Sequence, residues 1–345
     1  MSTTTPSPAP GSSAGAAVPG PAAASVPVQV PVPVPVQTPT PTTGERALVL
    51  GGGGSTGNAW LIGVVAGLAD AGVDVTTADL TVGTSAGATT AAQLAGATPA
   101  ELYAAVVAGA PPRRAPDPGR DDRRERTRQA ADQMARTAAL IAASRDAADM
   151  RRRLGAAALD LPAASDASAQ ARWRATGAGG LPSTAWPRRA LLLTAVDART
   201  GAPVVLGAHS GVDLVDAVAA SCAGGFAYGV GPDRFIDGGY RRNENADLAA
   251  GCRRVLVLSP LGGRTRTPRE WGMQLDVQVA ELRAQGSAVE TLVPDGPAEG
   301  LVGPRAMDLT LRPAAARAGH GQGVEAAARG ARRWRRGATR RGGRR

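Results

Sequence analysis

Two glycine-rich turns, each between a short apolar run and a run with helical spacing, constrain the fold of this chain more than any other feature. The first turn, Gly51–Gly57, follows the apolar stretch at 46–50, and the second, Gly83–Gly87, follows Leu80–Val82. After the first turn, apolar residues recur on one face of a predicted helix, at Leu61, Val64, Val65 and Leu68. A helix of small residues follows the second turn. This order predicts two parallel strands joined by a right-handed crossover.

The second turn has the spacing G-x-S-x-G, with Ser85 between Gly83 and Gly87. In such a turn a serine between strand and helix projects its hydroxyl, and the glycines relieve crowding of the backbone. Ser85 would stand at a helix N-terminus, where backbone N–H groups favour developing negative charge. Because this spacing also arises by chance in glycine-rich chains, its position after a predicted strand is the stronger evidence. We therefore predict that Ser85 is a nucleophile.

The first turn has two interpretations. The backbone N–H groups of Gly52, Gly53 and Gly54 could hold the oxyanion of a tetrahedral intermediate. A glycine turn between strand and helix also binds phosphates and dinucleotides. Against a nucleotide site, no Lys-Ser/Thr pair follows the glycines, and the strand that ends near Val82 is followed by glycine rather than by an acidic residue. The oxyanion interpretation is favoured.

A serine needs a base to take its proton, and the chain offers three candidates. Asp237 ends a short predicted strand at 234–236, and the following Gly238-Gly239 makes a tight turn that would aim its carboxylate. It would need desolvation or close contact with the serine to act near neutral pH. His320 follows Ser85 and Asp237 in the order of an α/β-hydrolase triad, but it lies in a glycine-rich stretch. His209 precedes Asp237 in a predicted loop, and we expect both histidines to be surface residues.

The rest of the chain alternates strands and helices, which predicts an α/β fold of three layers, αβα, with a mostly parallel central sheet. Further strands are predicted at Ala190–Val196, with a hairpin partner at Gly201–Gly207, and at Arg254–Leu258. Further helices are predicted at Val212–Ala219, from Asn245, at Asp276–Ala284 and at Ala314–Arg336.

Composition divides the chain into three parts. Residues 1–43 are mostly Pro, Ala, Thr, Ser and Val, which predicts a disordered or polyproline-like segment. We expect a folded domain over 44–312, and an Arg-rich helix and tail over 313–345. Within the domain, an Arg- and Ala-rich helical insertion at about 111–187 interrupts the alternation of strands and helices. The insertion is either a cap over the site or a solvated structural addition.

The positive charge of the chain is all arginine. The formal net charge is +10, and nine arginines lie between Arg329 and the last residue, so the remainder is close to neutral. The tail is either a peripheral contact for anionic membranes or a solvated terminus, and no specific nucleic acid is expected. Cys222 and Cys252 are too few for a disulfide framework or a metal site, and no metal or cofactor is expected. With no predicted transmembrane helix and no recognisable export signal, we expect a cytoplasmic protein, with or without peripheral contact with a membrane, and export stays an open alternative.

Three motifs together resemble the patatin-like phospholipase family, in its bacterial branch. They are the first turn from Gly52 to Gly57, the second turn around Ser85, and Asp237-Gly238-Gly239. The segment Asn245-Ala246-Asp247-Leu248 is also similar, and the resemblance covers roughly residues 46–307. It implies a patatin-like fold, a Ser85–Asp237 dyad without histidine, an oxyanion hole at Gly52–Gly54, and hydrolysis of lipid or other acyl esters through an acyl-enzyme.

Two departures from the family pattern concern the site. Many members carry Arg or Lys where this chain has Thr56, so a positive charge beside the first turn is missing. A proline-bearing loop of the family is replaced here by Ala223-Gly224-Gly225-Phe226-Ala227-Tyr228. The alternatives that stay open are a Ser85–Asp237–His320 esterase of the α/β-hydrolase type and a non-catalytic module that binds lipid or another anion.

Overall fold

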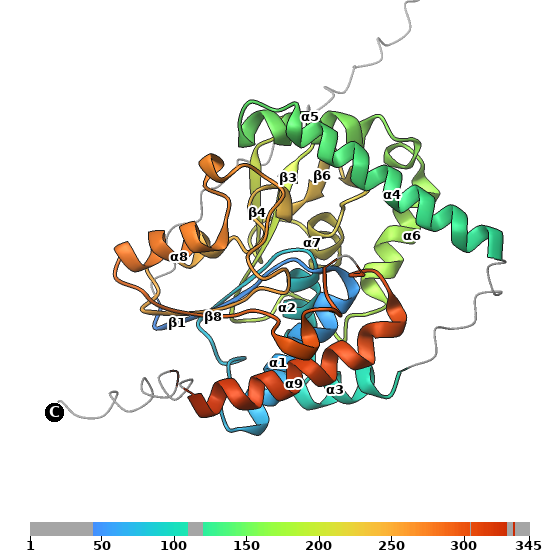
Figure 1. Cartoon of the computed structure of the whole chain (residues 1–345). Coiled ribbons are helices and arrows are strands. Elements are labelled where there is room, and N and C mark those ends of the chain that lie inside the picture. The colour runs from blue at the N-terminus through green and yellow to red at the C-terminus, as the bar shows by residue number, and fades with distance from the viewer. Residues whose placement is uncertain (1–43, 110–119, 304, 330–333, 335–345) are drawn as a thin grey trace, which may run out of the picture. The chain divides into compact units, whose positions relative to one another are not determined.

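The structure, a computed structural model, describes residues 44–109, 120–303, 305–329 and Trp334. An eight-stranded sheet has the order β5-β6-β3-β2-β1-β7-β8, with β4 paired to β3 outside this row (Figure 1). The parallel strands are β1 (Arg46–Leu50), β2 (Leu80–Gly83), β3 (Ala190–Asp197), β7 (Arg254–Leu258) and β8 (Ala288–Leu292). The antiparallel ones are β4 (Pro203–Leu206), β5 (Tyr228–Val230) and β6 (Asp233–Asp237). The prediction of a mostly parallel sheet is confirmed.

The register of three neighbouring strands brings distant residues to one level of the sheet. Gly83 at the end of β2 pairs with Leu193 of β3, and Ala195, two residues further along β3, pairs with Asp237 of β6. Ser85 lies two residues beyond Gly83. The strands β2 and β6 lie on opposite sides of β3. This register therefore places Ser85 and Asp237 at the same level of the sheet, one on each side of β3.

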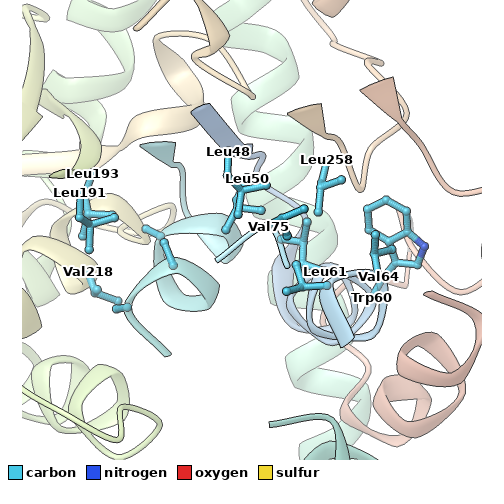
Figure 2. Packing of buried hydrophobic residues seen from close by; sticks show 14 of the residues in the cluster. Leu48, Leu50, Trp60, Leu61, Val64, Val75, Leu191, Leu193, Val218 and Leu258 are labelled. Atoms are coloured by element: carbon cyan, nitrogen blue, oxygen red, sulfur yellow. The ribbon is translucent and has the colours of Figure 1, made fainter. Parts of the chain in front are cut away.

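Helices cover both faces of the sheet, which gives the three layers. On one face lie α1 (Gly54–Asp70), α2 (Ala86–Gly96), α7 (Leu214–Ser221) and α9 (Arg312–Arg329). On the other lie α8 (Leu275–Ala284) and the 3₁₀ turn η3 (Ala246–Ala249). Alternation along the strands supplies both cores, since Leu48 and Leu50 of β1 face the first layer while Ala47 and Val49 face the second. Figure 2 shows Leu48 and Leu50 in the cluster that contains Trp60 of α1.

The helices α1 and α9 pack so closely that their backbones are in contact. A Cβ on Gly319 or Gly323 of α9 would overlap a carbonyl oxygen of α1, that of Trp60 or of Val64. The side chain of Trp60 is fully buried and donates from Nε1 to Gln322 Oε1 of α9 at 3.0 Å. Because α9 is packed so closely on α1, we propose that the folded domain continues through this helix to Arg329.

The insertion is helical and packs on the sheet at the β3–β6 side (Figure 1). It consists of α4 (Arg120–Ala142), α5 (Ala147–Leu159), the 3₁₀ turn η1 (Pro162–Ala164) and α6 (Ala167–Ala178). Its apolar residues Ile141, Met150 and Leu154 form a buried cluster with Val196 of β3 and Ile236 of β6. At least the inner face of the insertion is therefore part of the core.

Sequence and structure differ in where one helix begins and in the type of another. The predicted helix at 212–219 begins two residues later, as α7, because Asp213 is its N-cap. The helix predicted from Asn245 is only the 3₁₀ turn η3, since Asn245 has a left-handed backbone (φ 56°). The short helix α3 (Pro99–Val107) begins with a capping box between Thr98 and Glu101.

The predictions for the two ends of the chain concern mostly residues that the structure does not describe. Residues 1–43 and 335–345 lie outside the described ranges, so the predictions for the Pro-rich segment and for the arginine tail stay predictions. Trp334 is described and buried, with Nε1 donating to the carbonyl of Asp74 at 3.2 Å and the guanidinium of Arg46 lying 5.5 Å from its ring centroid. Within the described ranges, no helix is long and apolar enough to cross a bilayer.

Candidate active site

Ser85 lies at the N-cap of α2, directly after β2, with φ 52° and ψ −114°. A positive φ is unusual for any residue other than glycine. Among the described residues, Ser85 and Asn245 are the only non-glycine residues that have one. The backbone N–H of Ser85 donates to the hydroxyl of Ser221, a buried residue of α7, at 2.9 Å. A contact from α7 therefore stabilises the strained turn, as expected where strain serves a function.

The glycines on either side of Ser85 are required by packing. A Cβ on Gly87 would overlap the carbonyl of Leu50 at the end of β1, and a Cβ on Gly83 would lie 2.7 Å from Cα of Ala88. Neither position leaves room for any side chain. The G-x-S-x-G spacing thus reflects the close approach of the second turn to β1.

Asp237 is the last residue of β6 and its side chain is half-buried. Burial raises the pKa of its carboxyl to about 6, while hydrogen bonds from the Gly239 N–H and from the Ser85 hydroxyl act in the opposite direction. The Gly239 N–H lies 2.7 Å from Oδ1. Gly238 is pressed against Thr194 of β3, where a Cβ would overlap the threonine. The carboxylate therefore has a fixed position next to Ser85 and a pKa close to neutral.

Ser85 and Asp237 share a cavity of about 320 Å³. Gly52 and Gly53 of the first turn form one side of it, and a Cβ on Gly52 would lie 3.6 Å from Cβ of Ser85. Ile141 of α4, Met150 of α5 and Met273 provide apolar wall, and the exposed residues Arg264 and Arg266 lie on the loop after β7. The structure thus brings the two turns and Asp237 together at one cavity.

The three backbone N–H groups of the first turn are not equivalent. The N–H of Gly52 donates to the carbonyl of Asn243 at 3.1 Å, so it is already occupied. In the part of the chain that the structure describes, the N–H groups of Gly53 and Gly54 have no acceptor, as expected at the start of α1. Gly54 has φ 64° and Gly53 packs on Pro260, where a Cβ would lie 2.5 Å from the proline Cβ. Gly57 closes the turn by donating to the carbonyl of Gly53 at 3.1 Å.

Two asparagines after the Asp237 turn hold the site together, and the sequence analysis gave neither of them a role in the site. Asn245 is fully buried, and its Nδ2 donates to the hydroxyls of Thr84 at 2.9 Å and of Thr194 at 3.1 Å. It therefore joins the residue before Ser85 to β3. Asn243 donates from Nδ2 to the carbonyl of Gly52 at 3.3 Å and to Glu244 Oε1 at 2.8 Å. For Asn245 a signal was present, because asparagine tolerates the left-handed backbone that it adopts here.

A positive charge lies beside the first turn even though Thr56 is uncharged. Arg312, the first residue of α9, donates to the carbonyl of Ser55 at 2.7 Å, to its hydroxyl at 3.0 Å and to Asn58 Oδ1 at 3.0 Å. Burial lowers the pKa of Arg312, and no carboxylate of the described residues pairs with it. A residue far along the chain thus places a guanidinium where the sequence indicated that one was missing.

Neither histidine lies at the cavity. His320 Nε2 is 2.7 Å from Oδ2 of Asp70, the last residue of α1, and its ring stacks on Tyr103 at 4.7 Å between centroids. The backbone of His320 lies against Gly63 and Gly67 of α1, and since α1 begins at Gly54, this is about 15–20 Å from the first turn. The geometry therefore does not support the Ser85–Asp237–His320 alternative.

The thiol nearest the site is not a competing nucleophile. Cys222 lies within 3.5 Å of the Thr89 hydroxyl, and burial together with the charge of Asp237 raises its pKa to about 12. It therefore stays protonated at neutral pH. Among the described residues no group of three His, Cys, Asp or Glu side chains is placed to bind a metal ion.

The fold and the site define an α/β protein of three layers with a strained serine at a strand-to-helix turn and a carboxylate beside it. The sequence model of the patatin-like phospholipase family matches residues 48–250, and the chain belongs to this family. The match begins in β1 and ends after η3, so it contains both turns, the insertion and Asp237. The family is one of lipid acyl hydrolases. A comparison with curated proteins found no match.

Proposed function

We propose that this protein is a serine lipid acyl hydrolase that works with a Ser85–Asp237 dyad through an acyl-enzyme. The observation that supports this most directly is the strained serine at the same cavity as a carboxyl whose pKa is raised to about 6. A base works best when its pKa lies near the working pH, and an aspartate in water is far too acidic for this.

The proposed reaction has two halves. Asp237 accepts the proton of the Ser85 hydroxyl while Oγ attacks the ester carbonyl, and the N–H groups of Gly53 and Gly54 hold the oxyanion. The bond from the carbonyl carbon to the alcohol oxygen then breaks, and Asp237 returns the proton to the leaving alcohol. Next, water gives a proton to Asp237 and attacks the acyl-enzyme, which releases the fatty acid and returns the proton to Ser85.

Labelling with a fluorophosphonate tests the nucleophile. The wild type should be labelled, and Ser85→Ala should lose the label completely because the attacking oxygen is gone. Ser165→Ala is the matched control, since this exposed serine lies in the insertion and should leave labelling unchanged. A folded wild type that takes no label would favour the alternative of a non-catalytic lipid- or anion-binding module.

The pH profile tests the base. Because burial raises the pKa of Asp237 to about 6, its active, ionised form predominates above this pH. We expect kcat/KM for an acyl ester to be level at pH 7–8 and to fall tenfold per pH unit below about pH 6. His320→Ala should leave this profile unchanged. A profile that stays level down to pH 4.5 would exclude a base with this environment.

A further inference from the structure

A second cavity, of about 360 Å³, adjoins the cavity of Ser85 and Asp237. Gly224 and Tyr240 line both, so the two cavities meet at these residues. The rest of the second cavity is bounded by α4 and α5 of the insertion and by the loop that carries Gly225. Figure 1 shows α4 and α5 beside β3 and β6, the strand that ends at Asp237. The cavity is therefore an extension of the site beneath the insertion.

The wall of this cavity is mainly apolar. Its apolar side chains include Leu140, Leu154, Ala157, Ala158, Leu161 and Ile236.

Polar side chains of the same wall make hydrogen bonds within the protein, and Arg136 among them is exposed to solvent. Tyr240 donates its hydroxyl to the carbonyl of Gly224 at 3.3 Å, Thr137 donates to the carbonyl of Gln133 at 2.9 Å, and Arg136 donates to Gln133 Oε1 at 3.3 Å. A ligand in this cavity gains little from hydrogen bonds and much from burying hydrocarbon.

We propose that this second cavity binds the alkyl chain of a single acyl group whose ester carbonyl lies between Ser85 and the first turn. The chain passes Gly224 and Tyr240 and ends against α4 and α5. A volume near 360 Å³ is at the lower end of the range for small-ligand sites, so one chain of medium length fits rather than two. The inference rests on the proposed hydrolase function and adds the substrate class, esters of medium-chain fatty acids.

The chain-length dependence of the wild type is the first measurement. With p-nitrophenyl acetate, butyrate, octanoate, laurate and palmitate below their micelle concentrations, kcat/KM should rise about fourfold per methylene that enters the cavity. The rise should stop at a medium chain because the cavity is then full. Equal kcat/KM for acetate and octanoate would overturn the inference while leaving the hydrolase function intact.

Two substitutions fill the cavity from opposite walls. Ala157→Leu acts from α5, and Gly225→Val acts from the loop, where a Cβ meets no atom within 4 Å and φ is not positive. Because the added carbons displace two or three methylenes, Ala157→Leu should lower kcat/KM for octanoate about 15- to 60-fold. Acetate should change less than twofold. The matched control is Ala156→Leu, the exposed neighbour that does not line the cavity, and it should leave the octanoate-to-acetate ratio unchanged.

The outcomes separate the two levels of the proposal. Acetate turnover that depends on Ser85 also shows that each variant is folded. An unchanged octanoate-to-acetate ratio in both Ala157→Leu and Gly225→Val would place the alkyl chain elsewhere and overturn the inference. Loss of fluorophosphonate labelling from the wild type would instead remove the hydrolase function itself.

Discussion

Asp237→Asn should lower kcat/KM for an acyl ester by about 10²- to 10⁴-fold, because the proposed dyad has no second base. The amide oxygen of asparagine can still accept the hydrogen bond from the Gly239 N–H, so the turn itself is preserved. The amide cannot take the proton of Ser85. Turnover of p-nitrophenyl octanoate by purified protein measures this loss, with His320→Ala as the control that keeps its activity.

The same substitution should also raise the stability of the fold at neutral pH. The pKa of Asp237 rises from 3.8 to about 6 on folding, so the folded state binds this proton more tightly than the unfolded state. The stability that protonation contributes is present below the unfolded pKa and is lost as the pH rises through about 6. At about 1.4 kcal/mol per pKa unit, ionised Asp237 weakens the fold at pH 8.

Thermal unfolding at several pH values measures this second effect. The Tm of Asp237→Asn should exceed that of the wild type at pH 8 and approach it at pH 4. A residue with only a structural role would lose stability on substitution at both pH values. Activity that falls while stability rises is therefore the signature of a catalytic carboxylate, and lower stability at pH 8 would contradict it.

Gly319→Ala and Gly323→Ala in α9 should together lower the Tm by several degrees. Each added Cβ overlaps a carbonyl oxygen of α1, so the two helices must move apart. Overpacking of this kind destabilises by about 1–3 kcal/mol per site, which exceeds the gain of about 1 kcal/mol in helix propensity. Thermal unfolding followed by circular dichroism measures the change.

The control for this prediction lies in the same helix. Gly321 is exposed between the two contact glycines, and a Cβ there meets no atom within 4 Å. Gly321→Ala should therefore gain helix propensity alone and raise the Tm slightly. If all three alanines raised the Tm, α9 would not be packed on α1 as the structure has it.

Loosening the contact between α1 and α9 should also lower the activity. The first glycine turn leads into α1, and Arg312 at the start of α9 donates to the carbonyl of Ser55 in the first helical turn of α1. A displacement of α9 therefore moves groups at the cavity although neither glycine lies there. We expect the double variant Gly319→Ala, Gly323→Ala to lower kcat and to change KM little, since the position of the groups at the cavity matters most in the transition state.

The sequence by itself determined the local parts of this protein. Each glycine turn could be predicted because a glycine between an apolar run and a helical run is a property of neighbouring residues. Ser85 and Asp237 could be identified as candidates in the same way, since each lies in a short motif at the end of a strand. The alternation of strands and helices was enough to predict a sheet with helices on both faces, together with the insertion.

Only the tertiary structure decided how these parts meet. The level at which Ser85 and Asp237 face each other depends on the register of β3 with β2 and β6, which no local pattern encodes. The occupied N–H of Gly52 and the guanidinium of Arg312 are contacts between residues about 190 and 257 positions apart in the chain. The cavity beneath α4 and α5 likewise exists only once the insertion has packed on β6. Motifs follow from neighbours in sequence, whereas a site follows from which strands lie side by side.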